Sequence, residues 1–337
     1  MKAMQLAEFG MDQFRTVNLP QPVPGAGQVL VEFHAASVNF RDVLIAKGVF
    51  APASDLPIIP LSDGAGEVVK IGEDVKTLKI GDRVAPLFFP NWISGDALGA
   101  ERAVSSGLEA DGVLREYGVY DENAVVTCAD HLSYEEAACY PCAGLTAWTS
   151  LVTVSHVAQG SCVLVLGTGG VALNALQFAK ALGATVIITS SSDDRLAQAK
   201  ALGADHTINY RTVPEWGAAA KEITLGRGVD MVLEVGGTGT LPQSFKAIRR
   251  GGHIPIIGNL SGAKMDIEVY QLILTNAHLH GIGVGNRDGF EEMMRFVGAH
   301  EIHPVIAKTY AFEEAPKAVR DADAGGYFGK LIVKIKS

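Results

Sequence analysis

The sequence contains little cysteine, no excess of basic residues and no long apolar run. Its four cysteines are too few for a disulfide framework in 337 residues, and we expect free thiols in a reducing compartment. A formal net charge of -9 argues against binding to nucleic acid, which requires clustered lysine and arginine. No apolar run approaches the roughly 18 residues of a membrane span, and residues 1–5 lack the apolar core of a signal peptide. We therefore expect a cytoplasmic protein with neither nucleic acid nor a membrane as its partner.

The composition is sufficient for two folded domains. Hydrophobic residues make up 48% of the chain and charged residues 19%, the balance of an ordinary globular protein. The first third is rich in glycine, proline and valine, and turn residues separate its short extended runs. This pattern predicts a mostly antiparallel β region. The predicted strands cover residues 28–34, 64–71, 82–87 and 114–119.

From about residue 141 onward, strand-like apolar runs alternate with helix-like runs. The alternation is typical of βαβ units and predicts a parallel sheet. Its predicted strands are 163–166, 184–189, 206–209 and 229–235, and its predicted helices are 171–182 and 193–202. The end of the chain adds predicted helices at 289–296 and 312–321 and a strand at 329–335.

A glycine-rich turn follows the first strand of this parallel sheet, in residues 163–172 (VLVLGTGGVA). Gly167 permits the tight turn, and Gly169 lets backbone N–H groups approach a pyrophosphate. The helix that begins there adds the positive end of its dipole. A strand before the glycines and a helix after them are the context that a dinucleotide site requires. The segment therefore predicts a dinucleotide cofactor.

The end of the second strand bears on the choice between NAD and NADP. An NAD site places a carboxylate there for the ribose 2′-hydroxyl, but this strand ends in residues 190–192 (SSS). Serine hydroxyls can donate to a 2′-phosphate, and Arg195 can add a charge-assisted hydrogen bond, so we predict NADP(H). The predicted donors are Ser190, Ser191, Arg195 and Tyr210. Two alternatives stay open: an ordinary helix cap at Ser192, and NAD binding beside the acidic residues 193–194.

Three segments together resemble the medium-chain dehydrogenase/reductase superfamily: residues 37–42 (SVNFRD), 60–66 (PLSDGAG) and 141–147 (PCAGLTA). The glycine-rich turn and residues 201–205 (ALGAD) fit the same pattern, so the resemblance covers nearly the whole chain. It implies an α/β fold in which a Rossmann doubly wound parallel sheet is inserted in a GroES-like, mostly β catalytic domain. It also implies a homodimer. The implied domains are 1–125 with 285–337 for catalysis, and 126–284 for the dinucleotide.

The chain lacks the residues that hold the catalytic zinc in the zinc alcohol dehydrogenases of this superfamily. At the positions of the Cys and His ligands it has Asn39 and Ser62, and Cys142 alone matches a ligand. A catalytic zinc needs three protein ligands, which an amide, a hydroxyl and one thiolate do not supply. Residues 91–111, in place of the structural zinc lobe, contain neither cysteine nor histidine. The resemblance therefore implies the zinc-independent branch of quinone and enoyl reductases, with no metal site.

Residues 38–45 (VNFRDVLI) are similar to the enoyl-reductase domains of polyketide synthases. The resemblance places Asn39, Arg41 and Asp42 at the nicotinamide end of the site, as the predicted catalytic residues. There Asn39 or Arg41 would donate to the substrate oxygen on which negative charge develops. A structural ion pair between Arg41 and Asp42 is the alternative. The predicted lining of an apolar substrate pocket is Phe50, Phe88, Phe89 and Trp92, whose alternative role is packing between the domains.

The remaining predicted cofactor contacts come from the resemblance and from the carboxyl ends of the sheet strands. They are Thr146, Gly167, Thr168, Gly169, Gly170, Val171, Val235, Gly258, Asn259, Leu260, Val284, Gly285, Arg287 and Lys330. Together these features predict NADPH-dependent reduction of a carbon–carbon double bond conjugated to a carbonyl, or of a quinone, with a small apolar or aromatic substrate. The alternatives are an alcohol dehydrogenase or carbonyl reductase of the same superfamily, and a cofactor-binding protein without activity.

Overall fold

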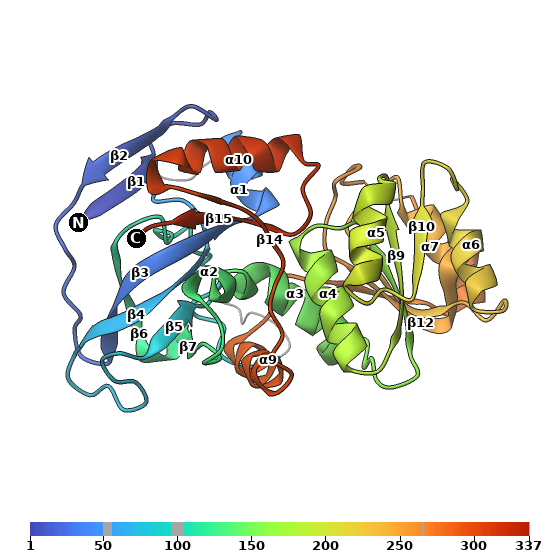
Figure 1. Cartoon of the computed structure of the whole chain (residues 1–337), viewed down its shortest axis with the longest axis horizontal. Helices are drawn as coiled ribbons and strands as arrows, with labels where there is room; N and C mark the ends of the chain where they lie inside the picture. Colours follow the sequence, from blue (N-terminus) through green and yellow to red (C-terminus); the bar gives the residue numbers. More distant parts are fainter. Residues whose placement is uncertain (50–55, 96–103, 265, 337) are drawn as a thin grey trace. The chain divides into compact units, whose positions relative to one another are not determined.

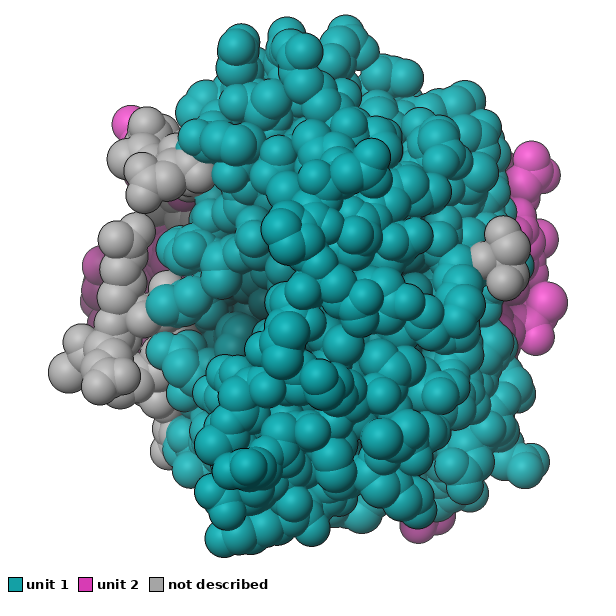
Figure 2. All heavy atoms as spheres, turned by 90° about the vertical axis from the view of Figure 1, so that its left-hand side faces the viewer, with its two compact units in different colours: residues 1–145, 285–337 teal, residues 146–284 magenta. Residues whose placement is uncertain are grey.

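The computed structural model describes residues 1–49, 56–95, 104–264 and 266–336. The chain divides into two compact units, which are coloured separately in Figure 2. Unit 1 comprises Met1–Leu145 and Gly285–Ser337, and unit 2 comprises Thr146–Val284. Within the described ranges, no helix is both long and apolar enough to cross a membrane.

Unit 1 is built around a seven-stranded, mostly antiparallel sheet (Figure 1). Its central strand is β3 (Gln28–Val38), which pairs antiparallel with β4 (Asp63–Ile71), β6 (Tyr117–Asp121) and β15 (Lys330–Lys334). The sheet is completed by β5 (Arg83–Pro86), β7 (Val125–Thr127) and β14 (Ile306–Tyr310). The strands predicted in the first third of the chain are confirmed, with shifted bounds.

The pairing of β3 gathers three segments of unit 1 at one end of the sheet. Val38, the last residue of β3, lies opposite Leu331 of β15, and Ser37 lies opposite Asp63 at the start of β4. The residues next to these pairs in sequence are Asn39, Ser62 and Lys330. Backbone register therefore brings together three side chains that are far apart in sequence.

Two helices of unit 1, α1 (Phe40–Ala46) and α10 (Ala315–Ala324), pack against each other (Figure 1). The buried residues of α10 follow the i, i+3, i+4, i+7 spacing of one helical face. They are Ala315, Ala318, Val319 and Ala322. Unit 1 also contains the hairpin of β1 (Lys2–Leu6) and β2 (Phe14–Asn18), and the helix α9 (Arg287–Ala299).

Unit 2 contains a six-stranded parallel sheet in the order β10-β9-β8-β11-β12-β13. The helices α4 (Gly170–Ala181) and α5 (Asp193–Ala201) cover one face, and α6 (Trp216–Ile223) and α7 (Leu241–Ala247) cover the other (Figure 1). The strands are β8 (Cys162–Leu166), β9 (Thr185–Ser190), β10 (His206–Asn209), β11 (Val229–Leu233), β12 (Ile248–Ile256) and β13 (His278–Gly281). The predicted α/β class, with a doubly wound sheet inserted in a mostly β unit, is confirmed.

Residues 126–145 belong to unit 1, whereas the resemblance implied that they belong to the dinucleotide-binding domain. In this stretch β7 pairs with β5, and α2 (Tyr134–Ala137) packs against β3 and β4. Both elements are too short to show a period in the sequence. The change to alternating strands and helices therefore begins only after these last elements of the first sheet.

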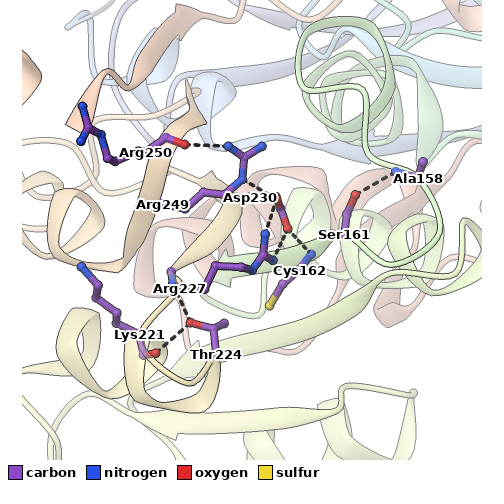
Figure 3. Close-up of polar contacts among 10 residues, drawn as sticks. Ala158, Ser161, Cys162, Lys221, Thr224, Arg227, Asp230, Arg249 and Arg250 are labelled. Atoms are coloured by element: carbon purple, nitrogen blue, oxygen red, sulfur yellow. Dashed lines mark hydrogen bonds and ion pairs between the residues drawn. The ribbon is translucent and has the colours of Figure 1, made fainter. Parts of the chain in front are cut away.

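A charged cluster joins the amino ends of three strands in unit 2 (Figure 3). The Asp230 carboxylate of β11 accepts hydrogen bonds from Arg227 at 2.9 and 2.6 Å, and from Nε of Arg249 in β12 at 2.5 Å. The backbone N–H of Cys162, at the start of β8, donates to the same carboxylate at 2.7 Å. Burial would raise the pKa of Asp230, but these hydrogen bonds lower it to about 2. The cluster therefore connects β8, β11 and β12 through hydrogen bonds to one carboxylate.

Four histidines gather around β12 and β13 of this sheet. His253 of β12 stacks on His278 and His280 of β13, with ring centroids 4.9 and 5.2 Å apart, and His156 makes an edge contact at 6.5 Å. Nδ1 of His253 lies 2.9 Å from Nε2 of His280. Burial, followed by repulsion from the neighbouring histidines and Arg249, lowers the pKa of His253 to about 4. His253 is therefore neutral at pH 7 and resists protonation.

We expect the thermal unfolding midpoint to fall as the pH is lowered from 6.5 towards 4. In this window the unfolded chain binds a proton at His253 that the folded chain does not bind. The free energy of unfolding therefore falls by on the order of 1 kcal/mol between pH 7 and pH 5. His253→Gln should flatten the dependence. His206→Gln, at an exposed position on β10, should leave it unchanged. Calorimetry at several pH values measures the slopes, and equal slopes for wild type and His253→Gln would contradict the assignment.

Candidate active site

The glycine-rich turn connects β8 to α4 in unit 2. Gly167 has a φ of +81°, which favours glycine, and its N–H donates to the carbonyl of Thr189 at 3.0 Å. Gly169 is the N-cap of α4 and has no side chain to satisfy the first N–H groups of the helix. A Cβ built on either glycine would meet no described atom within 4 Å beyond its chain neighbours. The turn therefore offers open space beside N–H groups that suit a pyrophosphate.

The predicted 2′-phosphate donors meet at the carboxyl ends of β9 and β10. The Arg195 guanidinium donates to the hydroxyls of Ser190 and Ser191, at 3.3 and 3.0 Å. The backbone N–H of Tyr210 donates to the carbonyl of Ser190 at 3.1 Å, and the Tyr210 side chain is exposed. Ser192 is the N-cap of α5. The helix cap thus uses one serine and leaves the other two beside the guanidinium.

The fully buried carboxylate of Glu234 stabilises the loop after β11 through hydrogen bonds. It accepts hydrogen bonds from the N–H groups of Gly236 and Gly237 at 2.8 and 3.1 Å. It also accepts from the hydroxyls of Thr240 and Ser244, both at 2.5 Å. Glu234 was not among the predicted site residues, although an acidic residue that ends an apolar strand is a visible signal of such a cluster.

Two further predicted cofactor contacts lie side by side at the ends of β11 and β12. A Cβ on Gly258 would come within 2.6 Å of the Val235 carbonyl oxygen, so only glycine fits there. The N–H of Leu260 donates to the same carbonyl at 3.4 Å. The turn after β8, the serines at the end of β9 and these loops all lie at the carboxyl ends of strands in one sheet, where open α/β sheets bind ligands.

Of the other predicted contacts, Thr146, Thr168 and Val284 are buried in unit 2, whereas Gly285, Arg287 and Lys330 belong to unit 1.

In unit 1, a chain of hydrogen bonds runs through the positions that correspond to zinc ligands. Nδ2 of Asn39 donates to Oγ of Ser62 at 3.3 Å, and this hydroxyl donates to Oδ1 of Asp63 at 2.7 Å. The other oxygen of Asp63 accepts from the backbone N–H of Cys142 at 3.0 Å. Burial raises the pKa of Asp63, and burial followed by the Asp63 charge raises the pKa of the Cys142 thiol to about 12. Cys142 is therefore a protonated thiol at neutral pH.

Lys330 lies at the other end of this chain. It is only 4% exposed, and its ammonium donates to Oδ1 of Asn39 at 2.5 Å and to the carbonyl of Val38 at 2.7 Å. Its charge acts against burial to lower the pKa of Asp63. Lys330, which was predicted to contact the cofactor, thus donates its hydrogen bonds to residues of unit 1.

Arg41 and Asp42, in the first turn of α1, have different partners. Arg41 donates to the carbonyl of Ser106 and to the hydroxyl of Ser105, both at 2.8 Å, and its guanidinium lies 4.5 Å from the centre of the Phe88 ring. Asp42 accepts from the backbone N–H of the N-cap residue at 2.7 Å, and burial raises its pKa to about 6. Nε of Arg41 and Oδ1 of Asp42 have no hydrogen-bond partner among the described residues. Both atoms are therefore buried polar groups whose hydrogen-bonding capacity is unused among the described residues.

Three of the four aromatic residues predicted for the substrate pocket pack in one row after β5. The rings of Phe88 and Phe89 meet edge to face at 4.6 Å, and those of Phe89 and Trp92 lie 6.2 Å apart. Phe88 lies against the Arg41 guanidinium, so the row adjoins that residue of α1. Phe50 lies outside the described residues.

Arg287, at the start of α9, forms an ion pair with Glu291 at 2.9 Å and donates to Asn123 at 3.1 Å. Arg287 and Glu291 line a surface groove of about 760 Å³ whose lining residues all belong to unit 1. These contacts engage the two terminal nitrogens of the guanidinium, whereas its buried Nε has no hydrogen-bond partner among the described residues. A cofactor contact by Arg287 stays a prediction.

The chain matches two family models and several curated proteins. Residues 25–131 match the alcohol dehydrogenase GroES-like domain, and residues 170–299 match the model described as zinc-binding dehydrogenase. A zinc-type alcohol dehydrogenase-like protein of Schizosaccharomyces pombe is 40% identical over 334 residues, which cover 97% of this chain and 96% of that protein. An alcohol dehydrogenase of Geobacillus stearothermophilus is 29% identical, with 100% and 99% covered. An acryloyl-coenzyme A reductase of Sulfurisphaera tokodaii is 26% identical, with 95% and 96% covered.

Solved structures share the whole fold. An NAD-dependent alcohol dehydrogenase superimposes with a TM-score of 0.91 at 32% identity, and the match covers 99% of each chain. A crotonyl-CoA carboxylase/reductase in complex with NADP gives 0.90 at 26% identity, with 100% of this chain and 95% of that chain covered. A quinone oxidoreductase of Pseudomonas syringae pv. Tomato DC3000 gives 0.83 at 29% identity, with 99% of each chain covered.

Proposed function

Since the chain belongs to the medium-chain dehydrogenase/reductase superfamily, we propose that it is an NADPH-dependent, zinc-free reductase of activated carbon–carbon double bonds or quinones. Membership itself makes the chain an oxidoreductase with a nicotinamide cofactor. The proposal adds the kind of nicotinamide, the independence from zinc and the class of substrate. The observation that carries it is the hydrogen-bond chain that joins Asn39 and Ser62, at the positions of two zinc ligands, to Asp63.

The side chains at these positions do not suit zinc, although one matching family model is described as zinc-binding. Catalytic zinc takes three protein ligands from thiolate, imidazole and carboxylate groups. Here Asn39 presents an amide, Ser62 a hydroxyl that is committed to Asp63, and Cys142 a protonated thiol. In the part of the chain that the structure describes, His, Cys, Asp and Glu side chains form no group of three that could hold a metal ion. We infer that no metal polarises the substrate oxygen.

The residues of unit 2 fit NADP(H), which supplies a hydride when it is bound. Gly167 and Gly169 leave room for a pyrophosphate beside the N-terminus of α4. At the end of β9, Arg195 holds the hydroxyls of Ser190 and Ser191, and these groups together would donate to a 2′-phosphate. The nearby carboxylate of Asp193 accepts a hydrogen bond of 2.7 Å from Nδ2 of Asn209, which lies on the adjacent strand β10. The related crotonyl-CoA carboxylase/reductase with bound NADP supports this choice.

Arg195→Ala should erase most of the preference for NADPH over NADH. A hydrogen bond to a charged group contributes roughly 1.5–3 kcal/mol, so the ratio of the two Kd values should fall about tenfold to a hundredfold. NADH binding should hardly change. Arg250→Ala, an exposed arginine at the amino end of β12, serves as the control. Fluorescence titration with both cofactors measures the ratio, and a wild type that binds both equally would refute the choice of NADPH.

A zinc-free site favours substrates that are already electrophilic. The carbonyl of an enone withdraws charge through the double bond, so its β-carbon accepts hydride without a Lewis acid, and a quinone behaves similarly. Negative charge then develops on the carbonyl oxygen, which needs a hydrogen-bond donor. Nε of Arg41 is buried and unsatisfied beside the Phe88 ring, so it would hold that oxygen over an apolar, aromatic surface. The similarity to an acryloyl-coenzyme A reductase and to a quinone oxidoreductase supports the same class.

The protein should reduce enones or quinones faster than it interconverts simple alcohols and ketones, and an enone should yield the saturated carbonyl compound. Arg41→Ala should lower kcat by roughly 100-fold, with a smaller effect on KM, because the donor acts on charge that develops in the transition state. Arg15→Ala, an exposed arginine on β2, is the matched control. Product analysis decides the outcome: an allylic alcohol as main product, or alcohol oxidation that outruns every enone and quinone, would refute the proposal.

An alcohol dehydrogenase or carbonyl reductase is the second candidate. The names of two relatives favour it, those of the Geobacillus stearothermophilus protein and of the NAD-dependent alcohol dehydrogenase structure. It requires that donors such as Arg41 polarise a saturated carbonyl without a metal. The same substrate panel separates the two candidates, and turnover of any substrate excludes a non-catalytic cofactor-binding role.

We propose that the assembly is a homodimer formed through β13. In the described chain β13 ends the sheet of unit 2, so its outer edge presents unpaired backbone groups. The adjacent helix α8 (Val269–Thr275) buries none of its residues. Four of its apolar side chains are between 63% and 74% exposed: Val269, Tyr270, Ile273 and Leu274. Two copies related by a two-fold axis would pair their β13 strands antiparallel and cover both α8 surfaces.

Light scattering during size exclusion should give twice the chain mass of 35.5 kDa. Ile273→Glu should shift the mass towards one chain, because the charge would be buried at the contact. Leu225→Glu, at a position that is 97% exposed elsewhere in unit 2, should leave the dimer intact. A monomeric wild type would exclude this surface as the contact.

The proposal also includes a cytoplasmic location. The cysteines Cys128, Cys139, Cys142 and Cys162 are all free thiols, a state that a reducing compartment maintains. The proposed NADPH-dependent chemistry is compatible with the same compartment.

A further inference from the structure

The guanidinium of Arg41 is held by a turn that lies far along the chain, in residues 105–110. Nη1 donates to the carbonyl of Ser106 and Nη2 donates to Oγ of Ser105, both at 2.8 Å, and both serines are buried. The same guanidinium lies over the Phe88 ring, 4.5 Å from its centre. A guanidinium is planar and rigid, so two hydrogen bonds and one ring contact determine its plane. The direction of the remaining N–H group, on Nε, follows from that plane.

The hydroxyl of Ser105 accepts from Arg41 because its own hydrogen is directed to a carboxylate. This hydroxyl donates to Oε2 of Glu109 at 2.5 Å, and the backbone N–H of Ser105 donates to the same oxygen at 2.9 Å. Burial would raise the pKa of Glu109, but these hydrogen bonds lower it, and the Arg41 charge acts in the same direction. The carboxylate is therefore ionised at neutral pH and can only accept. Glu109, Ser105 and Arg41 thus form a chain of hydrogen bonds with a single direction, which we call the arginine relay.

Backbone hydrogen bonds connect residues 105–110 to one another and to the aromatic row. The N–H of Ser106 donates to the carbonyl of Phe88 at 3.1 Å, and the N–H of Glu109 donates to the carbonyl of Ser105 at 3.2 Å. Phe88 therefore contacts the guanidinium through its ring and the turn through its backbone. The guanidinium and its acceptors share one support, so their relative orientation is set before a substrate arrives.

We propose that Ser105 and Glu109 are positioning residues that act through Arg41, by orienting its guanidinium so that Nε–H is directed in advance at the oxygen of the substrate. The inference rests on the proposed function, in which Arg41 donates to that oxygen, and adds the residues that orient this donor. A donor that is already oriented needs no reorganisation when negative charge develops in the transition state. A free arginine side chain has many rotamers, and most of them would direct Nε elsewhere.

The first experiment measures the kinetics of Ser105→Ala and Glu109→Gln with whichever substrate of the panel is turned over fastest. Ser105→Ala removes the acceptor for Nη2. Glu109→Gln keeps the shape, but its amide can donate to Ser105 and reverse the hydroxyl. Each change should lower kcat by about tenfold, with a smaller effect on KM, because the loss falls on the transition state. Glu8→Gln, at an exposed carboxylate elsewhere in unit 1, should leave both constants unchanged.

The second experiment is a double-mutant cycle with Arg41→Ala, which distinguishes an action through Arg41 from a direct or structural one. Once the guanidinium is removed, nothing remains for the relay to orient. Ser105→Ala and Glu109→Gln should therefore cause no further loss of kcat in the Arg41→Ala background. Circular dichroism and the thermal unfolding midpoint of every variant show whether the fold is retained.

Three outcomes would overturn the inference. A wild-type kcat in folded Ser105→Ala and Glu109→Gln would mean that Arg41 needs no relay. Losses of kcat that add to that of Arg41→Ala would mean that the two residues do not act through it. Losses that follow the unfolding midpoint across all variants would mean that the contacts only stabilise the turn. The proposed function fails on a different observation, the product analysis, because the cycle can be measured with any substrate that is turned over.

Discussion

The structure of unit 1 depends on a positive charge held away from water. An ammonium in such a place needs acceptors on several sides, and here they come from the end of β3 and the N-cap of α1. Asn39, which accepts from Lys330, is also the residue at which α1 begins. The first turn of that helix carries Arg41 and Asp42, so the ammonium contributes to the placement of both. The register of β3 with β15 thus contributes to the placement of the side chains that are predicted to be catalytic.

The fold could be predicted where a short segment of the sequence carries the signal for a helix or strand. It could not be predicted where an element depends on residues that are far apart in sequence. The strands of unit 2 at 163–166 and 206–209 are apolar runs between clear turns, and the structure has them nearly as predicted. A strand was expected before residues 258–260, but the bounds of β12 (Ile248–Ile256) were not predicted, because the charges and glycines of residues 249–252 (RRGG) do not look like a strand. In the structure Asp230 compensates the Arg249 charge, which no neighbouring residue in sequence reveals. α1 was missed because seven residues are too few to show a helical period.

The same distinction separates the two halves of the candidate site. The glycine turn and the serines after β9 lie within short segments, and each carries its own structural context in sequence. The polar chain of unit 1 joins residues 39, 62–63 and 330, which meet only through the pairing of β3 with β4 and β15. Asn39 and Ser62 were recognisable because they stand where zinc enzymes of the superfamily have a Cys and a His ligand. Lys330 was expected at the cofactor, and its partner Asn39 followed only from the strand register. Glu234 was missed because its partners, two backbone N–H groups and the hydroxyls of Thr240 and Ser244, meet it only in the folded loop.

The sheet of unit 2 assigns different tasks to its two ends. At the amino end, Asp230 and its arginines bind three strands to one another (Figure 3). At the carboxyl end lie the turns and loops suited to a ligand, and most of their contacts are confined to the loops themselves. Substitutions at the carboxyl end can therefore accumulate during evolution while the frame of the sheet is conserved by its other end. Such a division gives descendants of one ancestral fold the freedom to change ligands without first having to acquire a new core.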